Sequence, residues 1–437
     1  MAGKVKNSGF EEEKIMIEPQ NIAEYVGQFI NMQSATPIES IYDCSCNKYF
    51  LKGNDKVLEF SRFLFEEKTE EELFDSFNKE SWTFDADVVG TIFFFLSGYW
   101  ERKRPQYTDK LGRYIGTESF SYKNKCILVP VVDILVNMIF EKLDINKREF
   151  YNFPKLCVTH DIDFFRQPQF RAAARNIIKE KRVKQGIRRL IDSLLNRNPF
   201  DLDNLLEKEL QLGLKPICFL LNTVQKEETR GGYNLSHLKR ETKIVRGKAI
   251  RGVEFGIHYS TDYLENQNVG NYKEIEKITE KQANFGRAHY LVFDLDRSFQ
   301  IYEKNGVHID FTGGYRDCIG FRFGTSLPFH PYDFRKGKAY TLWIVPLILM
   351  DGTWISIEED IKSDIRKKQV LGEILQQIEK TNGMFTILWH NTSFAYDVWS
   401  KYQKWYWDII QTLKEKNYKM VNTENILKLE KEEKYWR

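Results

Sequence analysis

Short apolar runs alternate with longer amphipathic stretches through most of the chain after Pro154. The runs have the length of buried strands, and they lie at residues 156–158, 217–221, 253–257, 290–293, 307–311, 342–349, 385–389 and 420–421. Helical patterns fill several of the intervals between them, at residues 202–212, 272–285 and 361–380. Regular alternation of strands and helices predicts an α/β fold, either a (β/α) barrel or a doubly wound sheet.

The chain before residue 150 has a different pattern. Its helical or apolar segments lie at residues 57–67, 70–77, 88–99 and 131–143. Its polar residues do not gather in a catalytic pattern. We therefore predict two domains, a smaller accessory α/β domain of unknown role at residues 1–150 and the barrel at residues 151–437.

Composition supports globular domains and gives no indication of a nucleic-acid partner. Hydrophobic residues make up 42% of the 437 positions, which is enough for ordinary cores. The net charge is only +3 on a background of 29% charged residues. The six cysteines show no metal-ligand spacing, which is typical of proteins from a reduced compartment.

Hydropathy predicts a soluble, cytoplasmic protein. The first twenty residues hold three consecutive glutamates and no apolar core, so no secretory signal is visible. The longest apolar stretches, at residues 88–96 and 342–350, are far shorter than the ~20 residues that span a bilayer.

One basic segment, at residues 166–197, stands apart. It carries ten Lys or Arg against two acids, Glu180 and Asp192. Its apolar residues recur at helical spacing, at Ile177, Ile178, Val183, Ile187, Leu190, Ile191, Leu194 and Leu195. Such an amphipathic helix either packs one face on its own domain or contacts anionic lipid or a pyrophosphate-linked lipid. The second reading would place the protein at the periphery of the inner membrane.

The most informative stretch is residues 156–163, where a predicted strand runs into two acids. Aspartates are poor strand formers, and at the carboxyl end of a buried strand they often mark a ligand site. Asp161 and Asp163 are two positions apart, so on a straight strand they share one face. Two carboxylates so close repel each other unless a cation or a proton lies between them.

Polar residues follow other predicted strands in the same way. They are Asn222, His258, Ser260, Asp262, Asp310, His390 and Asn391. In a parallel barrel these strand ends meet at one rim. Two histidines and several acids at one rim predict a carboxylate–histidine metal site with an open position for water.

These residues resemble the motifs of the polysaccharide deacetylases of the NodB type, over roughly residues 154–427. The family's first motif is similar to Thr-His-Asp-Ile-Asp at residues 159–163, which implies that Asp161 is the base and Asp163 a metal ligand. The second, His-Ser/Thr-x-x-His, keeps only His258, and Asp262 takes the second slot. The resemblance implies a distorted (β/α) barrel.

Two further motifs extend the resemblance. Arg-Ala-His-Tyr at residues 287–290 is similar to the family's Arg-x-Pro-Tyr, which implies that Arg287 holds the base and that the backbone N–H of Tyr290 binds the oxyanion. The segment at residues 383–390 is similar to the last motif and implies that His390 is the general acid. The first region and residues 320–325 resemble a bacterial subgroup with an uncharacterised N-terminal domain.

The resemblance implies a metal-dependent hydrolase, most simply with Zn²⁺, that removes an N-acetyl or O-acetyl group from a sugar or glycan precursor. The third metal ligand stays open: Asp262, His289 and His160 are the candidates, and weak or absent metal binding is the alternative. On the substrate side we expect five residues, His160, His289, Asp310, Arg322 and Trp389.

Some residues have two interpretations. Arg322 could meet a sugar acid or phosphate, or it could pair with Asp333 on the flank. Trp389 either packs beneath the site or offers a platform to a sugar. Asp351 either lines the rim or forms an Asp-Gly turn.

Two other functions remain open at this point. The missing second histidine suggests a barrel that has lost its chemistry and binds glycan or scaffolds a polysaccharide-assembly complex. A different amidohydrolase chemistry on a non-sugar amide is the other. The oligomeric state is not predicted.

Overall fold

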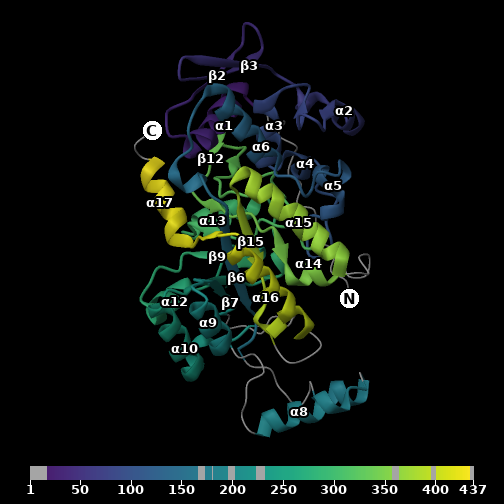
Figure 1. Ribbon diagram of the computed structural model, residues 1–437, viewed down its shortest axis with the longest axis vertical. Helices are drawn as coiled ribbons and strands as arrows, with labels where there is room; N and C mark the ends of the chain where they lie inside the picture. The colour runs from purple at the N-terminus through teal and green to yellow at the C-terminus, as the bar shows by residue number, and fades with distance from the viewer. Residues whose placement is uncertain are drawn as a thin grey trace.

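The structure is a computed structural model that describes residues 17–165, 173–179, 181–194, 202–222, 232–356, 364–394 and 400–433. The predicted α/β barrel is present in a distorted form, with a smaller α/β region at its N-terminal side (Figure 1). Within the described residues, the main sheet runs in the order β13-β10-β9-β8-β7-β6-β15-β14, and β16 also pairs with β6. Every pairing in this sheet is parallel.

The strands of the main sheet are short. They are β6 (Lys155–Ile162), β7 (Ile217–Leu220), β8 (Glu254–Tyr259), β9 (Phe285–Ala288), β10 (Ile309–Asp310), β13 (Trp343–Ile344), β14 (Leu349–Met350), β15 (Met384–Leu388) and β16 (Lys419–Met420). All residues of β6 and β15 are buried, as expected for parallel strands with both faces covered.

The barrel is distorted where the predicted strand at residues 342–349 divides into β13 and β14. Pro346 lies between them, and proline has no N–H to donate to a sheet. No pairing joins β13 to β14 among the described strands. Instead Val345 N donates to Asp310 O at 2.8 Å and Ile348 N donates to Thr386 O at 3.1 Å, so this segment crosses from β10 to β15.

Helices surround the strands of the barrel (Figure 1). They are α9 (Leu202–Gln211), α10 (Lys239–Ile250), α11 (Tyr263–Asn266), α12 (Tyr272–Thr279), α13 (Arg297–Lys304), α14 (Asp351–Ser356), α15 (Asp364–Thr381), α16 (Ser400–Glu415) and α17 (Thr423–Glu433). Helix α8 (Val183–Leu194) lies apart from them, at the end of the molecule opposite the N-terminal region. None of the helices in the described part of the chain has the length and apolarity needed to cross a membrane.

The N-terminal region combines helices with a small antiparallel sheet. Its main elements are α1 (Pro19–Gln33), β1 (Glu39–Asp43), β2 (Lys48–Gly53), β3 (Lys56–Ser61), α2 (Glu70–Ser76), β4 (Phe77–Asn78), β5 (Thr83–Phe84), α3 (Val88–Leu96), α4 (Tyr99–Arg102), α5 (Phe120–Lys123) and α6 (Val131–Leu143). The predicted helices at residues 70–77 and 131–143 are confirmed as α2 and α6, and α3 covers most of residues 88–99.

Two predicted elements are wrong. Residues 57–67 form β3 and a short 3₁₀ turn, because Asn54 and Asp55 both adopt positive φ and close a two-residue hairpin between β2 and β3. The strand predicted at residues 290–293 is also wrong, because the strand in this part of the chain ends at Ala288. The strand there is β9, and Tyr290 and Leu291 after it adopt positive φ and turn the chain away from the sheet.

A continuous hydrophobic core joins the N-terminal region to the barrel. It includes Phe93 of α3, whose ring lies 4.9 Å from that of Tyr332. Buried Asp133 of α6 accepts hydrogen bonds from Ser326 N at 2.9 Å and Ser326 Oγ at 2.6 Å. The two regions therefore support each other, while their division into domains at residue 150 stays a prediction.

Candidate metal centre and active site

Asp161 and Arg287 form a buried ion pair inside the barrel. Arg287 Nη1 lies 2.9 Å from Asp161 Oδ1, and their side chains are 0% and 3% exposed. Arg287 Nε also donates to Phe311 O at 3.0 Å, and the guanidinium lies over the ring of Phe219. These contacts fix the arginine, and Asp161 Oδ2 faces His258 Nε2 at 3.5 Å. The structure thus brings together Asp161, the expected base, and Arg287, the residue expected to hold it in place.

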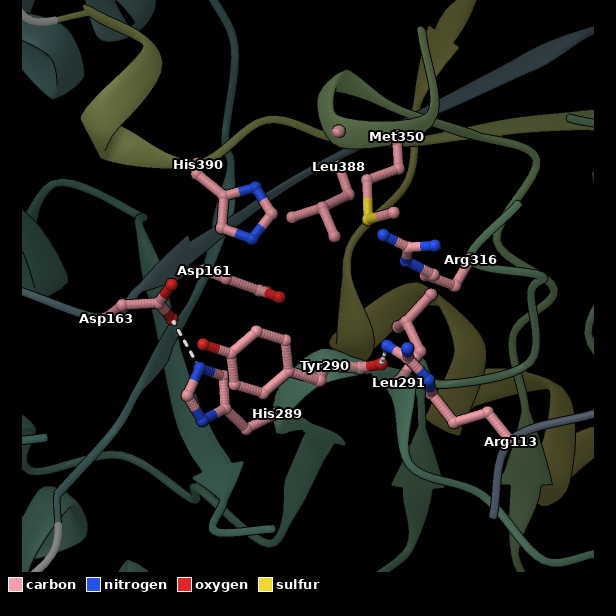
Figure 2. A pocket seen from close by; sticks show the side chains of 11 residues that line it. Arg113, Asp161, Asp163, His289, Tyr290, Leu291, Arg316, Met350, Leu388 and His390 are labelled. Atoms are coloured by element: carbon pink, nitrogen blue, oxygen red, sulfur yellow. Dashed lines mark hydrogen bonds and ion pairs between the residues drawn. The ribbon is translucent and has the colours of Figure 1, made fainter. Parts of the chain in front are cut away.

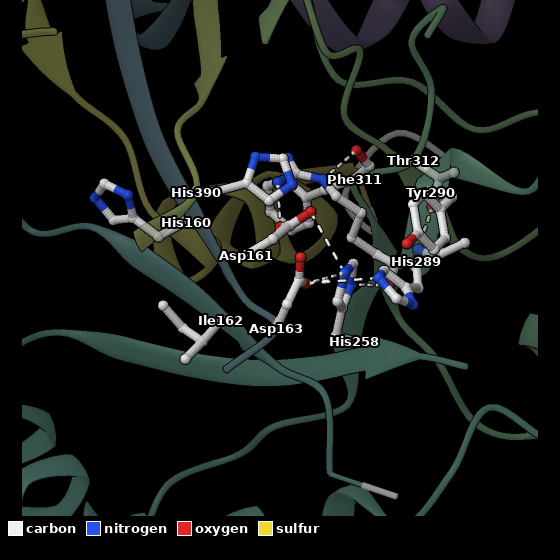
Figure 3. A network of polar contacts seen from close by, with 12 residues as sticks. His160, Asp161, Ile162, Asp163, His258, His289, Tyr290, Phe311, Thr312 and His390 are labelled. Atoms are coloured by element: carbon white, nitrogen blue, oxygen red, sulfur yellow. Dashed lines mark hydrogen bonds and ion pairs between the residues drawn. The ribbon is translucent and has the colours of Figure 1, made fainter. Parts of the chain in front are cut away.

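Asp163, His258 and His289 converge beside this pair (Figure 3). Asp163 Oδ1 lies 3.4 Å from His258 Nε2 and 3.8 Å from His289 Nε2. One ligand atom from each residue lies within 4.8 Å of the others. In a tetrahedral zinc site with bonds of about 2.0–2.2 Å, ligand atoms are about 3.4 Å apart. The three side chains can therefore hold a metal ion, whose identity the geometry does not fix.

Two buried atoms in this group have no hydrogen-bond partner among the described residues. They are Asp163 Oδ1 and His258 Nε2, and both point into the space between the three side chains. Burying polar atoms without partners is costly, so such atoms usually mark a missing ligand or ion. His258 Nδ1 lies 2.8 Å from Arg287 O, which can only accept, so Nδ1 carries the proton of the neutral ring and Nε2 keeps its lone pair.

Electrostatics within the group favour charged forms. Burial opposes the shift, but Asp161 and Asp163 raise the pKa of His258 above its ordinary value. In return, and again against the effect of burial, the neighbouring histidines hold the pKa of Asp163 well below its usual range. A cation between these groups would replace the proton that they otherwise compete for.

His390 reaches the same cavity from the carboxyl end of β15 and is held by Asp351. His390 Nδ1 lies 2.7 Å from Asp351 Oδ1, and its backbone N donates to Asp351 Oδ2 at 2.9 Å. Burial favours the neutral ring, but Asp351 outweighs it and raises the pKa of His390 to about 10. This shift favours the protonated imidazole, which can donate a proton.

The sequence did not single out Asp351 as a partner of His390. The residue follows β14 directly and is the first residue of α14, where its carboxylate also accepts from Gly352 N, so the expected Asp-Gly turn is instead the start of a helix. The one sequence feature that points to Asp351 as a site residue is its place directly after an apolar run, which it shares with the other rim residues.

Four of these residues, Asp161, Asp163, His289 and His390, line a cavity of about 200 Å³ (Figure 2). His258 contacts Asp161 and Asp163 but is not one of the lining residues. Its lining residues are Arg113, Asp161, Asp163, His289, Tyr290, Leu291, Arg316, Met350, Gly352, Leu388 and His390. Figure 2 shows the acids and histidines toward one end and the two arginines toward the other. Arg113 comes from the N-terminal region, where the sequence showed no catalytic pattern.

Tyr290 lies at the rim in a left-handed conformation, with φ 58° and ψ 13°. Its side chain is 39% exposed, and its carbonyl accepts from Arg113 Nη1 at 2.8 Å. The ring of His289 stacks on that of Tyr290, with centroids 4.1 Å apart. The sharp turn after β9 thus presents both residues to the cavity.

His160 does not approach the metal group. Side chains alternate along β6, so His160 faces away from Asp161 and Asp163 (Figure 3). It is fully buried, with Nε2 2.9 Å from Glu209 Oε1 and Nδ1 2.6 Å from Trp389 O. Its expected role as a metal ligand or substrate contact is therefore wrong.

Asp262 also lies outside the metal group of the described residues. Its carboxylate bonds to Ser260 Oγ and to Asn266 Nδ2, at the start of α11. The chain turns after β8, so Asp262 does not occupy the place of a ligand, and His289 of the next strand end is the third group that the structure brings to Asp163 and His258.

Three other expected substrate contacts are not in the cavity. Asp310 is fully buried and accepts from Thr312 N and Oγ1, each at 2.9 Å. Arg322 pairs with Glu101 at 2.7 Å and not with Asp333. Trp389 is 0% exposed and packs on Tyr406, so it lies in the core and offers no sugar platform.

Comparisons with known proteins assign no activity to this chain. Residues 7–147 match a model described as "Family of unknown function (DUF7033)". No curated protein matches the chain. A crystal structure of a "putative polysaccharide deacetylase" from Mycobacterium smegmatis matches with a TM-score of 0.33 and 12% identity, over 55% of this chain and 77% of that one. A likeness at this level carries no argument about function.

Proposed function

We propose that the protein is a metal-dependent hydrolase that removes an acetyl group from a sugar or glycan precursor. The observation that carries the proposal is that three candidate metal ligands lie together beside one cavity, which is also lined by a carboxylate paired with Arg287 and by a histidine held by Asp351. These are the parts that hydrolysis of an amide or ester requires. The motifs that resemble polysaccharide deacetylases select the acetylated sugar as substrate.

Asp163, His258 and His289 would hold the metal. A divalent ion bound there supplies Lewis acidity, which polarises a carbonyl and makes water easier to deprotonate. The donor set of two imidazoles and one carboxylate fits zinc, and three protein ligands are usual in catalytic zinc sites.

The other side chains divide the proton transfers between them. Asp161 takes the proton of the attacking water, and the guanidinium of Arg287 balances its charge and holds it in place. His390 donates its proton to the leaving amine or alcohol, a contribution of roughly 10²–10⁴-fold in well-studied enzymes. The products are acetate and a free amino or hydroxyl group on the sugar.

The backbone N–H of Tyr290 is the proposed oxyanion donor. Its residue lines the cavity beside His289, at the turn that follows β9. A single well-placed donor of this kind contributes roughly 3–4 kcal/mol in well-studied cases.

The test is acetate release from a panel of acetylated sugars, measured together with metal content. Asp161→Asn should keep the metal and lose turnover by roughly 10²-fold or more, because the base is gone and the ligands remain. His258→Ala should lose both. Full activity of Asp161→Asn would show that the base is assigned wrongly.

The alternative is a barrel that binds glycan without chemistry. It is favoured by the second motif, where Asp262 stands in the histidine's place and does not join the metal group. Absence of metal from the purified and zinc-treated protein, with retained binding of an acetylated sugar, would support that reading.

A further inference from the structure

Helix α8 presents an exposed apolar stripe. Val183, Ile187, Ile191 and Leu194 are 50%, 48%, 47% and 78% exposed. Their spacing of four, four and three residues places them on one face of the helix. Large apolar side chains on a monomer's surface are usually scattered, so a continuous stripe of four calls for a partner.

The opposite side of α8 packs against the preceding segment of the same chain. A Cβ added to Gly186 would lie 2.3 Å from Ile177 Cγ1, in the neighbouring π-helical turn Arg175–Lys179. Arg189, on the same side as Gly186, is only 4% exposed. The helix therefore packs on its own chain through this side, and its apolar stripe is left at the surface, at one end of the molecule (Figure 1).

Basic side chains lie beside the stripe. Lys181, Arg182, Lys184 and Arg188 are exposed, and Lys184 and Arg188 each follow an apolar stripe residue by one position. Lys and Arg can extend their charged ends away from an apolar surface while their stems cover it. An apolar face bordered by Lys and Arg is the pattern of helices that lie in the interface of an anionic bilayer.

We propose that α8 docks the protein on an anionic lipid surface. The positive charge favours a lipid surface over a second copy of the chain. Pairing α8 with its copy would bring two basic edges close together, whereas anionic headgroups complement them. This proposal does not depend on the hydrolase activity.

The test is sedimentation of the full chain with phosphatidylcholine vesicles that contain or lack phosphatidylglycerol. The wild type should sediment with the anionic vesicles only, and less at high salt. Ile187→Asp combined with Ile191→Asp should abolish the binding, and Lys184→Glu with Arg188→Glu should weaken it by roughly 30-fold or more. Ile250→Asp is the matched control, since Ile250 is 75% exposed on α10 and should have no effect.

Equal sedimentation of the Ile187→Asp/Ile191→Asp variant and the wild type would overturn the proposal, as would failure of the wild type to bind anionic vesicles. A wild-type dimer in light scattering that this variant converts to a monomer would assign the stripe to self-association instead. Thermal unfolding of each variant serves as the folding check, because the substituted side chains are exposed.

A second observation concerns the arginine end of the active-site cavity. Arg316 is exposed there and forms no ion pair within the described residues. Arg113 is held in place by Asp109, with Nε 2.8 Å from Oδ2, and by the carbonyl of Tyr290. The acids that line the cavity, Asp161 and Asp163, lie toward its other end (Figure 2).

We infer, on the basis of the proposed hydrolase function, that the substrate carries a carboxylate or phosphate away from its acetyl group and that Arg316 and Arg113 bind it. The planar guanidinium forms paired hydrogen bonds with both kinds of group. Arg113 belongs to the N-terminal region, which would thereby take part in selecting the substrate.

Calorimetric binding separates this inference from the hydrolase proposal. Wild-type protein should bind N-acetylglucosamine 1-phosphate or the matching N-acetylated uronic acid at least roughly 10-fold more tightly than N-acetylglucosamine. The two charged sugars distinguish phosphate from carboxylate. Arg316→Gln should remove the preference, while Arg335→Gln, at an exposed arginine that does not line the cavity, should keep it.

Equal binding of neutral and charged sugars, or an unchanged preference in Arg316→Gln, would overturn the anion subsite. Binding that depends on Arg316 without any acetate release would keep the subsite and overturn the hydrolase function. In turnover assays Arg316→Gln should raise KM for charged substrates and leave kcat nearly unchanged, because it contacts a part of the substrate that does not react.

Discussion

The proposed proton donor His390 depends chiefly on the carboxylate of Asp351, with smaller contributions from Asp163 and Asp161. The contact of 2.7 Å between Asp351 Oδ1 and His390 Nδ1 orients the ring and raises its pKa to about 10. Arg287 plays the matching part for Asp161 across the cavity. The proposed acid and the proposed base are thus held by two separate buried partners, Asp351 and Arg287.

Asp351→Asn should lower the pKa of His390 toward its ordinary value of about 6.5. The imidazole then loses its proton at a lower pH, so the alkaline limb of kcat/KM should move to lower pH. The loss of activity should reach roughly 10²-fold at alkaline pH and be smaller in acid, where both proteins keep the proton. Ser393→Ala removes a neutral contact of Asp351 and is the control. An unchanged alkaline limb in Asp351→Asn would contradict the assignment of His390.

Several site residues could be predicted from the sequence because they end strands. Asp161, Asp163, His258 and His390 all follow predicted buried runs, and parallel strands bring their ends together. The sequence could not decide whether His289 or Asp262 is the third metal ligand, because both lie in turns whose direction depends on backbone conformation. The positive φ of Tyr290 directs the turn that carries His289.

At the scale of elements, the sheet depends on close packing between central strands. A Cβ on Gly286 of β9 would lie 2.3 Å from the carbonyl oxygen of Ile257 in β8 and 2.5 Å from the ring of Tyr259. Only glycine allows this approach, and it sets the position of Arg287, the next residue.

Gly286→Ala should therefore destabilise the protein by more than about 3 kcal/mol, since backbone atoms cannot yield as a side chain can. Gly247→Ala is the matched control. Gly247 lies exposed on α10 with nothing within 4 Å of an added Cβ, so alanine there should stabilise by about 0.5–1 kcal/mol. Urea denaturation measures both, and a Gly286→Ala midpoint equal to that of the wild type would refute the packing argument.

Elements with strong periodicity or complete burial could be predicted, such as α6, β6 and β15. The failures have local causes. The hairpin at Asn54 and Asp55 makes a strand of residues whose spacing suggested a helix, and Pro346 divides one apolar run into two strands.

At the scale of the whole molecule, the N-terminal region and the barrel share buried polar contacts as well as a core. Glu101 of α4 pairs with Arg322 at 2.7 Å, and their side chains are 6% and 3% exposed. Tyr315 OH donates to the same carboxylate at 2.7 Å. Long-range pairs of this kind leave no mark in the local sequence pattern, which is why the sequence suggested Asp333 as the partner of Arg322.

Glu101→Gln should cost about 3–5 kcal/mol of stability, because it leaves the charge of Arg322 buried without its partner. The exposed pair of Lys404 and Asp408 on α16 is the control, and Asp408→Asn should cost about 0.3–0.5 kcal/mol. Chemical denaturation of the wild type should show one cooperative transition, since one core spans both regions. Two separate transitions, with Glu101→Gln affecting only one, would contradict the shared core.

Metal binding by ligand variants tests the central claim most directly. The claim is that Asp163, His258 and His289 hold one divalent ion. After loading with zinc and removal of the excess, elemental analysis should find about one equivalent in the wild type and in Asp262→Ala. His289→Ala should lose the metal, because its ring supplies the third ligand. Full zinc content in His289→Ala, or none in the wild type, would contradict the account.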